Sequence, residues 1–118
     1  MTEASAGLPQ GWQVAVALDD IPANGLAETL MGERNLVLIV QRGDGFTAVQ
    51  GLCPHQMARL VHGAVLPDGH LQCPHHLAKF NLEDGTCSAG WILPPLKRYA
   101  TLVRDRHVLL PDPLVPLD

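Results

Sequence analysis

Two short pieces of the chain combine a cysteine, a proline and histidine, and these side chains bind transition metals. The pieces read Cys53-Pro54-His55-Gln56 and Cys73-Pro74-His75-His76. Thiolate and imidazole are ligands that iron and zinc accept in proteins. The proline after each cysteine fixes the backbone dihedral φ at that point and lends rigidity to both pieces. The two pieces therefore predict one metal site with four ligands.

The spacing of these residues is Cys-x-His, then 17 residues, then Cys-x-x-His. Each piece follows a predicted strand and precedes a loop, so two loop tips would each offer a thiolate and an imidazole to one point. The spacing alone does not decide whether His75 or His76 faces the metal. A tetrahedral structural zinc site uses the same donors at similar bond lengths. From the donors alone, zinc and an iron-sulfur cluster both stay open.

The elements that must position these tips are predicted to be mostly β. Segments between glycine and proline are short and rich in β-branched residues, and few windows sustain a helical period. Glycine, asparagine and aspartate in the connections are typical of hairpin turns. For the segment 22–31, a short helix is the alternative to a strand at 26–31. We expect strands at 12–17, 26–31, 36–41, 46–50, 70–72, 80–82, 96–103 and 107–110.

Length and composition restrict the class of protein. The 118 residues fit one domain. The longest apolar run, 36–40, is far shorter than the roughly 20 residues of a membrane helix. A formal charge of -4 with scattered bases argues against nucleic-acid binding. The first residues show neither the basic residues nor the apolar run of a targeting signal. Three cysteines are an odd number, which argues against a disulfide framework. We therefore expect a cytoplasmic protein without a membrane partner.

A family resemblance decides between the metals. The run from Cys73 to Asn81, followed by Gly85, resembles the second cluster loop of Rieske proteins, and Cys53-Pro54-His55-Gln56 resembles the first. The resemblance extends over most of 12–110 and includes the proline loop at Pro94-Pro95. It implies an antiparallel Rieske-type β-sandwich or barrel with a smaller cluster-binding subdomain of two loops. Residues 1–118 would form a single Rieske domain, with a core at about 12–110 and short tails.

The resemblance also implies the cofactor and its ligands. One Rieske-type 2Fe-2S cluster would be bound by Cys53 and Cys73 on one iron and by His55 and His76 on the other. Family spacing favours His76 over His75. Two thiolates and two neutral imidazoles cancel the charge of the oxidised cluster core, whereas four thiolates would leave it negative. Electron uptake is therefore less opposed than in an all-cysteine cluster.

The function implied by the resemblance is that of a ferredoxin, an electron carrier rather than an enzyme. Such carriers accept electrons from an NAD(P)H-dependent reductase and dock transiently, through the cluster tip, on a terminal oxygenase. Either an aromatic-ring dioxygenase or a diiron hydrocarbon monooxygenase would be the acceptor. The alternatives are the small Rieske subunit of a nitrite reductase and a zinc-stabilised interaction module.

Several positions depart from the family pattern. Met57 and Leu77 stand where free dioxygenase ferredoxins often have glycine, which leaves the fine geometry of both loops open. High-potential Rieske proteins carry a serine and a tyrosine at the positions of Ala78 and Phe80, so this chain is expected to have a low potential. Cys87 is expected to have no function. The proline-rich tail 111–117 is expected to be disordered, with packing on the domain or on a partner as the alternative.

Overall fold

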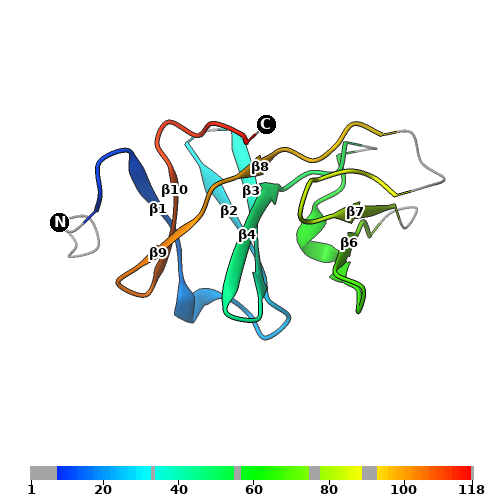
Figure 1. Ribbon diagram of the computed structural model, residues 1–118, viewed down its shortest axis with the longest axis horizontal. Helices are drawn as coiled ribbons and strands as arrows, with labels where there is room; N and C mark the ends of the chain where they lie inside the picture. Colours follow the sequence, from blue (N-terminus) through cyan, green and yellow to red (C-terminus); the bar gives the residue numbers. More distant parts are fainter. Residues whose placement is uncertain (1–7, 33, 55–56, 75–77, 89–92, 118) are drawn as a thin grey trace.

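The computed structural model of this protein describes residues 8–32, 34–54, 57–74, 78–88 and 93–117. These residues form β strands and two short 3-10 helices, which Figure 1 shows along the chain. The helices are η1 (Leu18–Asp20) and η2 (Leu60–His62). The strands are β1 (Trp12–Ala17), β2 (Leu26–Met31), β3 (Asn35–Arg42), β4 (Gly45–Gln50), β5 (Ala64–Val65), β6 (His70–Gln72), β7 (Lys79–Asn81), β8 (Arg98–Tyr99), β9 (Leu102–Arg104) and β10 (His107–Pro111).

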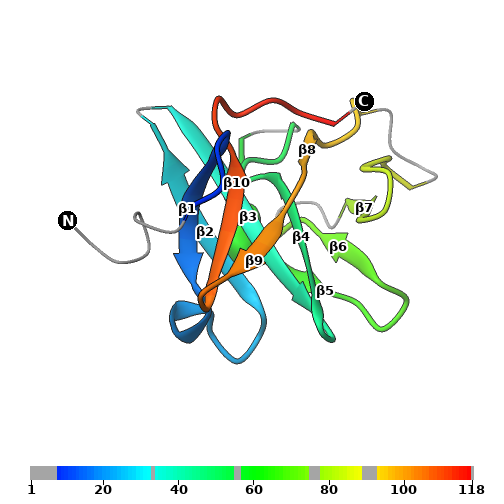
Figure 2. The ribbon, with the colours of Figure 1, turned by 60° about the vertical axis from the view of Figure 1, so that its left-hand side comes forward.

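The described strands form three antiparallel sheets. Their orders are β1-β10-β9, β2-β3-β4-β8 and β5-β6-β7. Figure 1 shows the three sheets following one another along the long axis of the molecule, with the four-stranded sheet in the middle. Figure 2 shows that β1 and β10 lie over β3 like the layers of a sandwich. The predicted mostly β, antiparallel fold is confirmed, and its described strands make open sheets rather than a closed barrel.

The middle sheet is buried on both faces. Successive side chains of a strand point to opposite faces. Along β3, Val37 and Ile39 pack toward the β1-β10-β9 sheet, whereas Leu38 and Val40 pack toward the β5-β6-β7 sheet. All four side chains are buried, so the long apolar run that the sequence shows at this strand belongs to two cores. The middle sheet is therefore the scaffold that both outer layers share.

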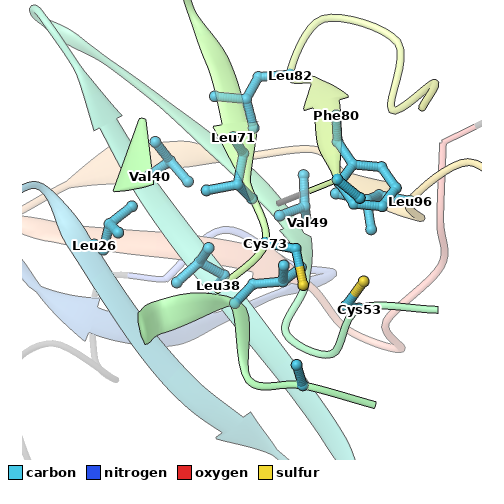
Figure 3. Packing of buried hydrophobic residues seen from close by; sticks show 13 residues of the cluster. Leu26, Leu38, Val40, Val49, Cys53, Leu71, Cys73, Phe80, Leu82 and Leu96 are labelled. Atoms are coloured by element: carbon cyan, nitrogen blue, oxygen red, sulfur yellow. The ribbon is translucent and has the colours of Figure 1, made fainter. Parts of the chain in front are cut away.

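We name the two cores by their position. The far-side core consists of Met31, Val37, Ile39, Ala48, Tyr99, Val108 and Leu110. The site-side core consists of Leu26, Leu38, Val40, Val49, Cys53, Ala58, Leu60, Leu71, Cys73, Ala78, Phe80, Leu82 and Leu96, most of which are labelled in Figure 3. Two of the cysteines that the sequence predicts as metal ligands are thus part of the site-side core.

Most predicted strands are found with the expected bounds or within one or two residues of them. Strands β1, β2 and β6 coincide with the predicted ranges. The helix proposed as an alternative for 22–31 is wrong, because β2 pairs with β3 over its whole length, from Leu26 opposite Val40 to Met31 opposite Asn35. The strand predicted at 80–82 lies one residue earlier, as β7.

Two strand predictions need a larger correction. The single strand expected at 96–103 is two strands, because the chain leaves the middle sheet after β8 and enters the β1-β10-β9 sheet at β9. Strand β5, which has two residues and pairs with β6, was not predicted. A segment this short carries too little pattern to be identified before its partner strand is known.

The C-terminal tail packs on the domain. Leu114 contacts the far-side core, and the backbone N–H of Leu117 donates a hydrogen bond to the carbonyl oxygen of Arg98 at 2.7 Å. The expectation of a disordered tail is therefore wrong for the described residues up to 117. Among the helices formed by the described residues, none has the length and apolar character needed to cross a bilayer.

Candidate iron-sulfur site

Both predicted cysteine ligands lie in loops that are closed by the same hydrogen bond. The backbone N–H of Cys53 donates to the carbonyl oxygen of Ala58 at 2.8 Å, and that of Cys73 donates to Ala78 at 2.7 Å. In each loop the acceptor lies five residues after the cysteine. The two cysteines of the repeated sequence pattern therefore share one backbone hydrogen bond of the same span.

The two thiol groups are buried and approach the same space. Cys53 and Cys73 have exposed fractions of 0% and 1%. Figure 3 shows both sulfur atoms directed to one edge of the site-side core. The folded chain thus brings together two cysteines that lie far apart in the sequence.

This environment fits an iron-sulfur cluster. A buried thiolate in apolar surroundings is costly unless a positive charge compensates it. None of the buried side chains among the described residues is polar or charged. Iron ions supply the missing charge, and cysteine thiolates are the usual ligands of 2Fe-2S clusters. The donor chemistry of Cys53 and Cys73 therefore suits the predicted cofactor.

The other half of the predicted ligand set consists of histidine imidazole groups. His55, His76 and the alternative ligand His75 lie outside the described residues. Within the part of the chain that the structure describes, no three histidine, cysteine or acidic side chains gather as a metal site. The described half of the predicted site is thus the pair of cysteines, and the assignment of the histidines stays a prediction.

The first loop keeps a left-handed turn at Met57, one of the positions where similar proteins often have glycine. Met57 has φ of 57°, and its N–H donates to the carbonyl oxygen of Cys53 at 3.0 Å. A residue with a Cβ atom adopts this conformation at a cost of about 1–2 kcal/mol. The Met57 side chain is 65% exposed. The loss of glycine therefore leaves the turn in place and adds an exposed apolar side chain to it.

The side chain of Gln50 connects this loop to the segment after the proline loop. Its Nε2 donates to the carbonyl oxygen of Leu52 at 2.7 Å, and its Oε1 accepts from the N–H of Lys97 at 2.8 Å. The N–H of Gln50 donates in turn to the carbonyl oxygen of Lys97 at 2.8 Å. Leu52 directly precedes Cys53, so Gln50 positions the start of the first loop. A glutamine at a strand end is ordinary, and the sequence offered no signal for this role.

An ion pair fixes the end of the same loop. The Nε of Arg59 donates to Oε2 of Glu28 on β2 at 3.2 Å, and an Arg59 terminal nitrogen contacts the other carboxylate oxygen. The hydrogen bond and the charge of Glu28 raise the pKa of the Arg59 guanidinium. The first loop is therefore attached to the middle sheet at both of its ends.

Cys87 is less buried than the other two cysteines. Its backbone pairs with that of Phe80, and its side chain packs against the site-side core. Burial raises the pKa of the Cys87 thiol, against a smaller opposite effect of a hydrogen bond from the Ser88 backbone. A thiol kept protonated is a poor metal ligand. The structure thus shows the Cys87 side chain in a packing position, and its lack of a function stays a prediction.

Comparisons with known proteins agree with this site. The Rieske [2Fe-2S] domain family matches residues 11–100. The ferredoxin component of the naphthalene 1,2-dioxygenase/salicylate 5-hydroxylase systems of Ralstonia sp is 26% identical over 103 residues, which cover 87% of this chain and 97% of that protein. The ferredoxin component of the alkene monooxygenase system of Xanthobacter autotrophicus is 36% identical over 69 residues, 58% of this chain and 56% of that protein.

A solved structure shares the fold. It is a complex of reduced oxygenase and oxidized ferredoxin in carbazole 1,9a-dioxygenase, and one of its chains matches with a TM-score of 0.77 at 23% identity. The match covers 93% of this chain and all of that chain. The family match spans most of the sequence and includes both cysteine loops. The chain therefore belongs to the Rieske [2Fe-2S] domain family, and one Rieske-type 2Fe-2S cluster is its cofactor.

Proposed function

We propose that this protein is a one-electron carrier that passes electrons from an NAD(P)H-dependent reductase to a terminal oxygenase. The observation that carries the proposal is the pair of buried cysteines, each of which donates the same backbone hydrogen bond to an alanine five residues later. Two similar proteins are ferredoxin components, one of a dioxygenase/hydroxylase system and one of an alkene monooxygenase system. The acceptor is accordingly an aromatic-ring dioxygenase or a diiron hydrocarbon monooxygenase. A cytoplasmic location is part of the proposal.

We assign the cluster ligands as the family resemblance implies. Cys53 and Cys73 would bind one iron, and His55 and His76 would bind the other, within a single domain formed by 1–118. When bound, the cluster supplies reversible one-electron chemistry. The protein contributes an apolar enclosure around the two thiolates, which Leu60, Ala78 and other residues of the site-side core provide.

The nature of the bound metal is the first test of this proposal. Anaerobically purified protein is expected to be red-brown, to contain iron and acid-labile sulfide in equal amounts, and to show a paramagnetic signal only after reduction. Metal analysis, sulfide assay and electron paramagnetic resonance measure these properties. A colourless protein that holds one zinc ion would contradict the proposal and favour the zinc-stabilised interaction module.

The proposed function itself is tested by reconstituted turnover. A reductase, this protein and a candidate oxygenase are mixed with NAD(P)H and substrate, and product formation is expected to depend on this protein. Product formation at the same rate without it would contradict the proposal. Copurification with a siroheme nitrite reductase, combined with failure to support any oxygenase, would instead favour the nitrite reductase subunit.

We further propose a low midpoint potential, because Ala78 and Phe80 are buried in the site-side core and have no hydroxyl group. A hydroxyl that donates a hydrogen bond to a cluster or cysteine sulfur stabilises the more negative, reduced state. The substitutions Ala78→Ser and Phe80→Tyr are therefore expected to raise the midpoint potential, as measured by protein-film voltammetry. Phe46→Tyr, beside the far-side core, is the control and is expected to leave the potential unchanged. A potential that rises in neither site variant would contradict this explanation.

A further inference from the structure

A shallow groove lies beside the first cysteine loop. Its volume is about 160 Å³, which is room for one large side chain. Its walls come from the β2–β3 hairpin, from the chain around the first loop and from the segment before β8. The residues that matter for its chemistry are the apolar Leu36, Leu52, Met57 and Tyr99 and the basic Arg34 and Lys97.

We propose that this groove receives an apolar side chain flanked by a carboxylate from a redox partner of this protein. The inference rests on the proposed function and specifies where and by what chemistry the partner is recognised. It assigns to Met57 and Lys97 the role of contact residues rather than ordinary surface positions.

The charge of the groove indicates the chemistry of its partner. Arg34 and Lys97 are exposed there, and the described residues that line the groove include no carboxylate. The chain as a whole has a formal charge of -4, whereas the charged side chains among the described residues of the groove, Arg34 and Lys97, are basic. Charges of opposite sign steer partners into contact and fix their orientation. A segment with an acidic side chain is the complementary partner.

The conformation of Met57 provides a second, independent observation. The residue pays the cost of positive φ, and it presents a side chain that is 65% exposed. Backbone strain of this kind clusters at functional sites, where it holds a side chain in a required place. The flexible, polarisable methionine side chain adapts to different apolar surfaces. Met57 thus provides a fixed backbone with an adaptable contact.

The groove is also directly connected to the cluster loop. Leu52 precedes Cys53 in the chain, and the N–H of Met57 donates to the Cys53 carbonyl oxygen at 3.0 Å. A partner side chain seated in the groove would therefore contact the loop that carries one of the thiolates. Electron-transfer complexes use small interfaces, often below about 1,200 Å² in total, so one anchored side chain is a substantial part of such a contact.

The walls of the groove are held together without a partner. The N–H of Gly51 donates to the carbonyl oxygen of Leu36 at 2.8 Å, which joins the hairpin to the first loop. The hydrogen bonds of Gln50 to Leu52 and Lys97 join the segment before β8 to the first loop. A preformed groove binds a partner without the cost of ordering its own walls.

The charge is tested with Lys97→Glu and its matched control Arg104→Glu. Arg104 is exposed on β9 in the outer sheet, so its replacement changes the net charge equally at a distant position. KM for this protein is measured in its reduction by the reductase and in its oxidation by the oxygenase. Lys97→Glu is expected to raise KM about ten-fold in at least one half-reaction. Arg104→Glu is expected to keep the wild-type value.

The apolar contact is tested with Met57→Asn and Val103→Asn. Asparagine tolerates positive φ, so the first substitution removes the methionine side chain and keeps the turn. Val103 is 47% exposed on β9 and serves as the control for loss of an exposed apolar side chain. Met57→Asn is expected to raise KM with kcat little changed, whereas Val103→Asn is expected to behave as wild type. The midpoint potential of each variant is measured so that a changed driving force is recognised.

The outcomes separate this inference from the proposed function. The inference would be overturned if both groove variants had the KM of the wild-type protein in both half-reactions. The electron-carrier function would still stand in that case, provided that the wild-type protein is active. Control variants that raise KM as much as the groove variants would overturn it as well. Wild-type protein that transfers no electrons to any oxygenase would instead overturn the proposed function, and the inference with it.

Discussion

Replacement of Cys73 by alanine is expected to abolish the binding of iron and acid-labile sulfide and to leave a colourless protein. The buried thiolate is one of the two protein groups that share the space at the edge of the site-side core. An alanine cannot ligate iron, and the remaining ligands would hold an open and reactive cluster. Iron content and visible absorption measure the loss, and circular dichroism shows whether the β structure is retained.

Cys87→Ala is the matched control for this experiment. Cys87 is half-buried, and its backbone pairs with Phe80 on β7. The substitution removes one half-buried sulfur atom, which is expected to cost about 1 kcal/mol of unfolding free energy. The protein should keep its full iron content. If Cys87→Ala loses the cluster and Cys73→Ala keeps it, the assignment of the ligands is wrong.

Gly63→Ala is expected to produce the largest loss of stability among single-methyl additions near the site. A Cβ atom at Gly63 would overlap the carbonyl oxygen of Gln72, a backbone atom that cannot move aside without shifting the chain. Gln72 directly precedes Cys73, so the clash would push the second loop away from the first. We expect a loss of about 3 kcal/mol in unfolding free energy. Iron should also be released faster to a chelator.

The control for the close approach is Gly43→Ala in the β3–β4 turn. Gly43 has φ of 61°, and a Cβ atom there would meet nothing within 4 Å. Only the conformational cost of positive φ applies, which is about 1 kcal/mol. Denaturant unfolding and chelator-induced iron release are measured on both variants. Equal losses of stability and equal rates of iron release in the two variants would contradict the prediction. They would show that the close approach of Gly63 to Gln72 has no special effect on stability or on iron retention.

Much of the fold can be predicted from the sequence because most strands have a local signal. Strand β1 is bounded by turn residues, and β6 lies between the Pro67-Asp68-Gly69 turn and a cysteine loop. The break between β8 and β9 has no such signal, since it arises where the chain passes from one sheet to another. For β2, pairing with β3 overrides the weak local pattern that allowed a helix.

The candidate site can likewise be predicted only in part from the sequence. The repeated Cys-Pro-His pattern predicts a shared site, and the structure brings Cys53 and Cys73 together as that pattern requires. The roles of Gln50 and Met57 depend on contacts with segments that fold next to them. No local pattern encodes such contacts, so these roles emerge only from the three-dimensional arrangement.

The placement of both thiolates beside one another has a consequence for the chain between them. Cys53 and Cys73 are 20 residues apart, and η2, β5 and β6 lie in that interval. If one iron ion joins the two sulfur atoms, this stretch becomes a closed macrocycle. By analogy with a disulfide of similar span, the restricted unfolded chain is worth about 3 kcal/mol. The iron would thus close this stretch of chain covalently without a disulfide bond, whose persistence requires an oxidising environment.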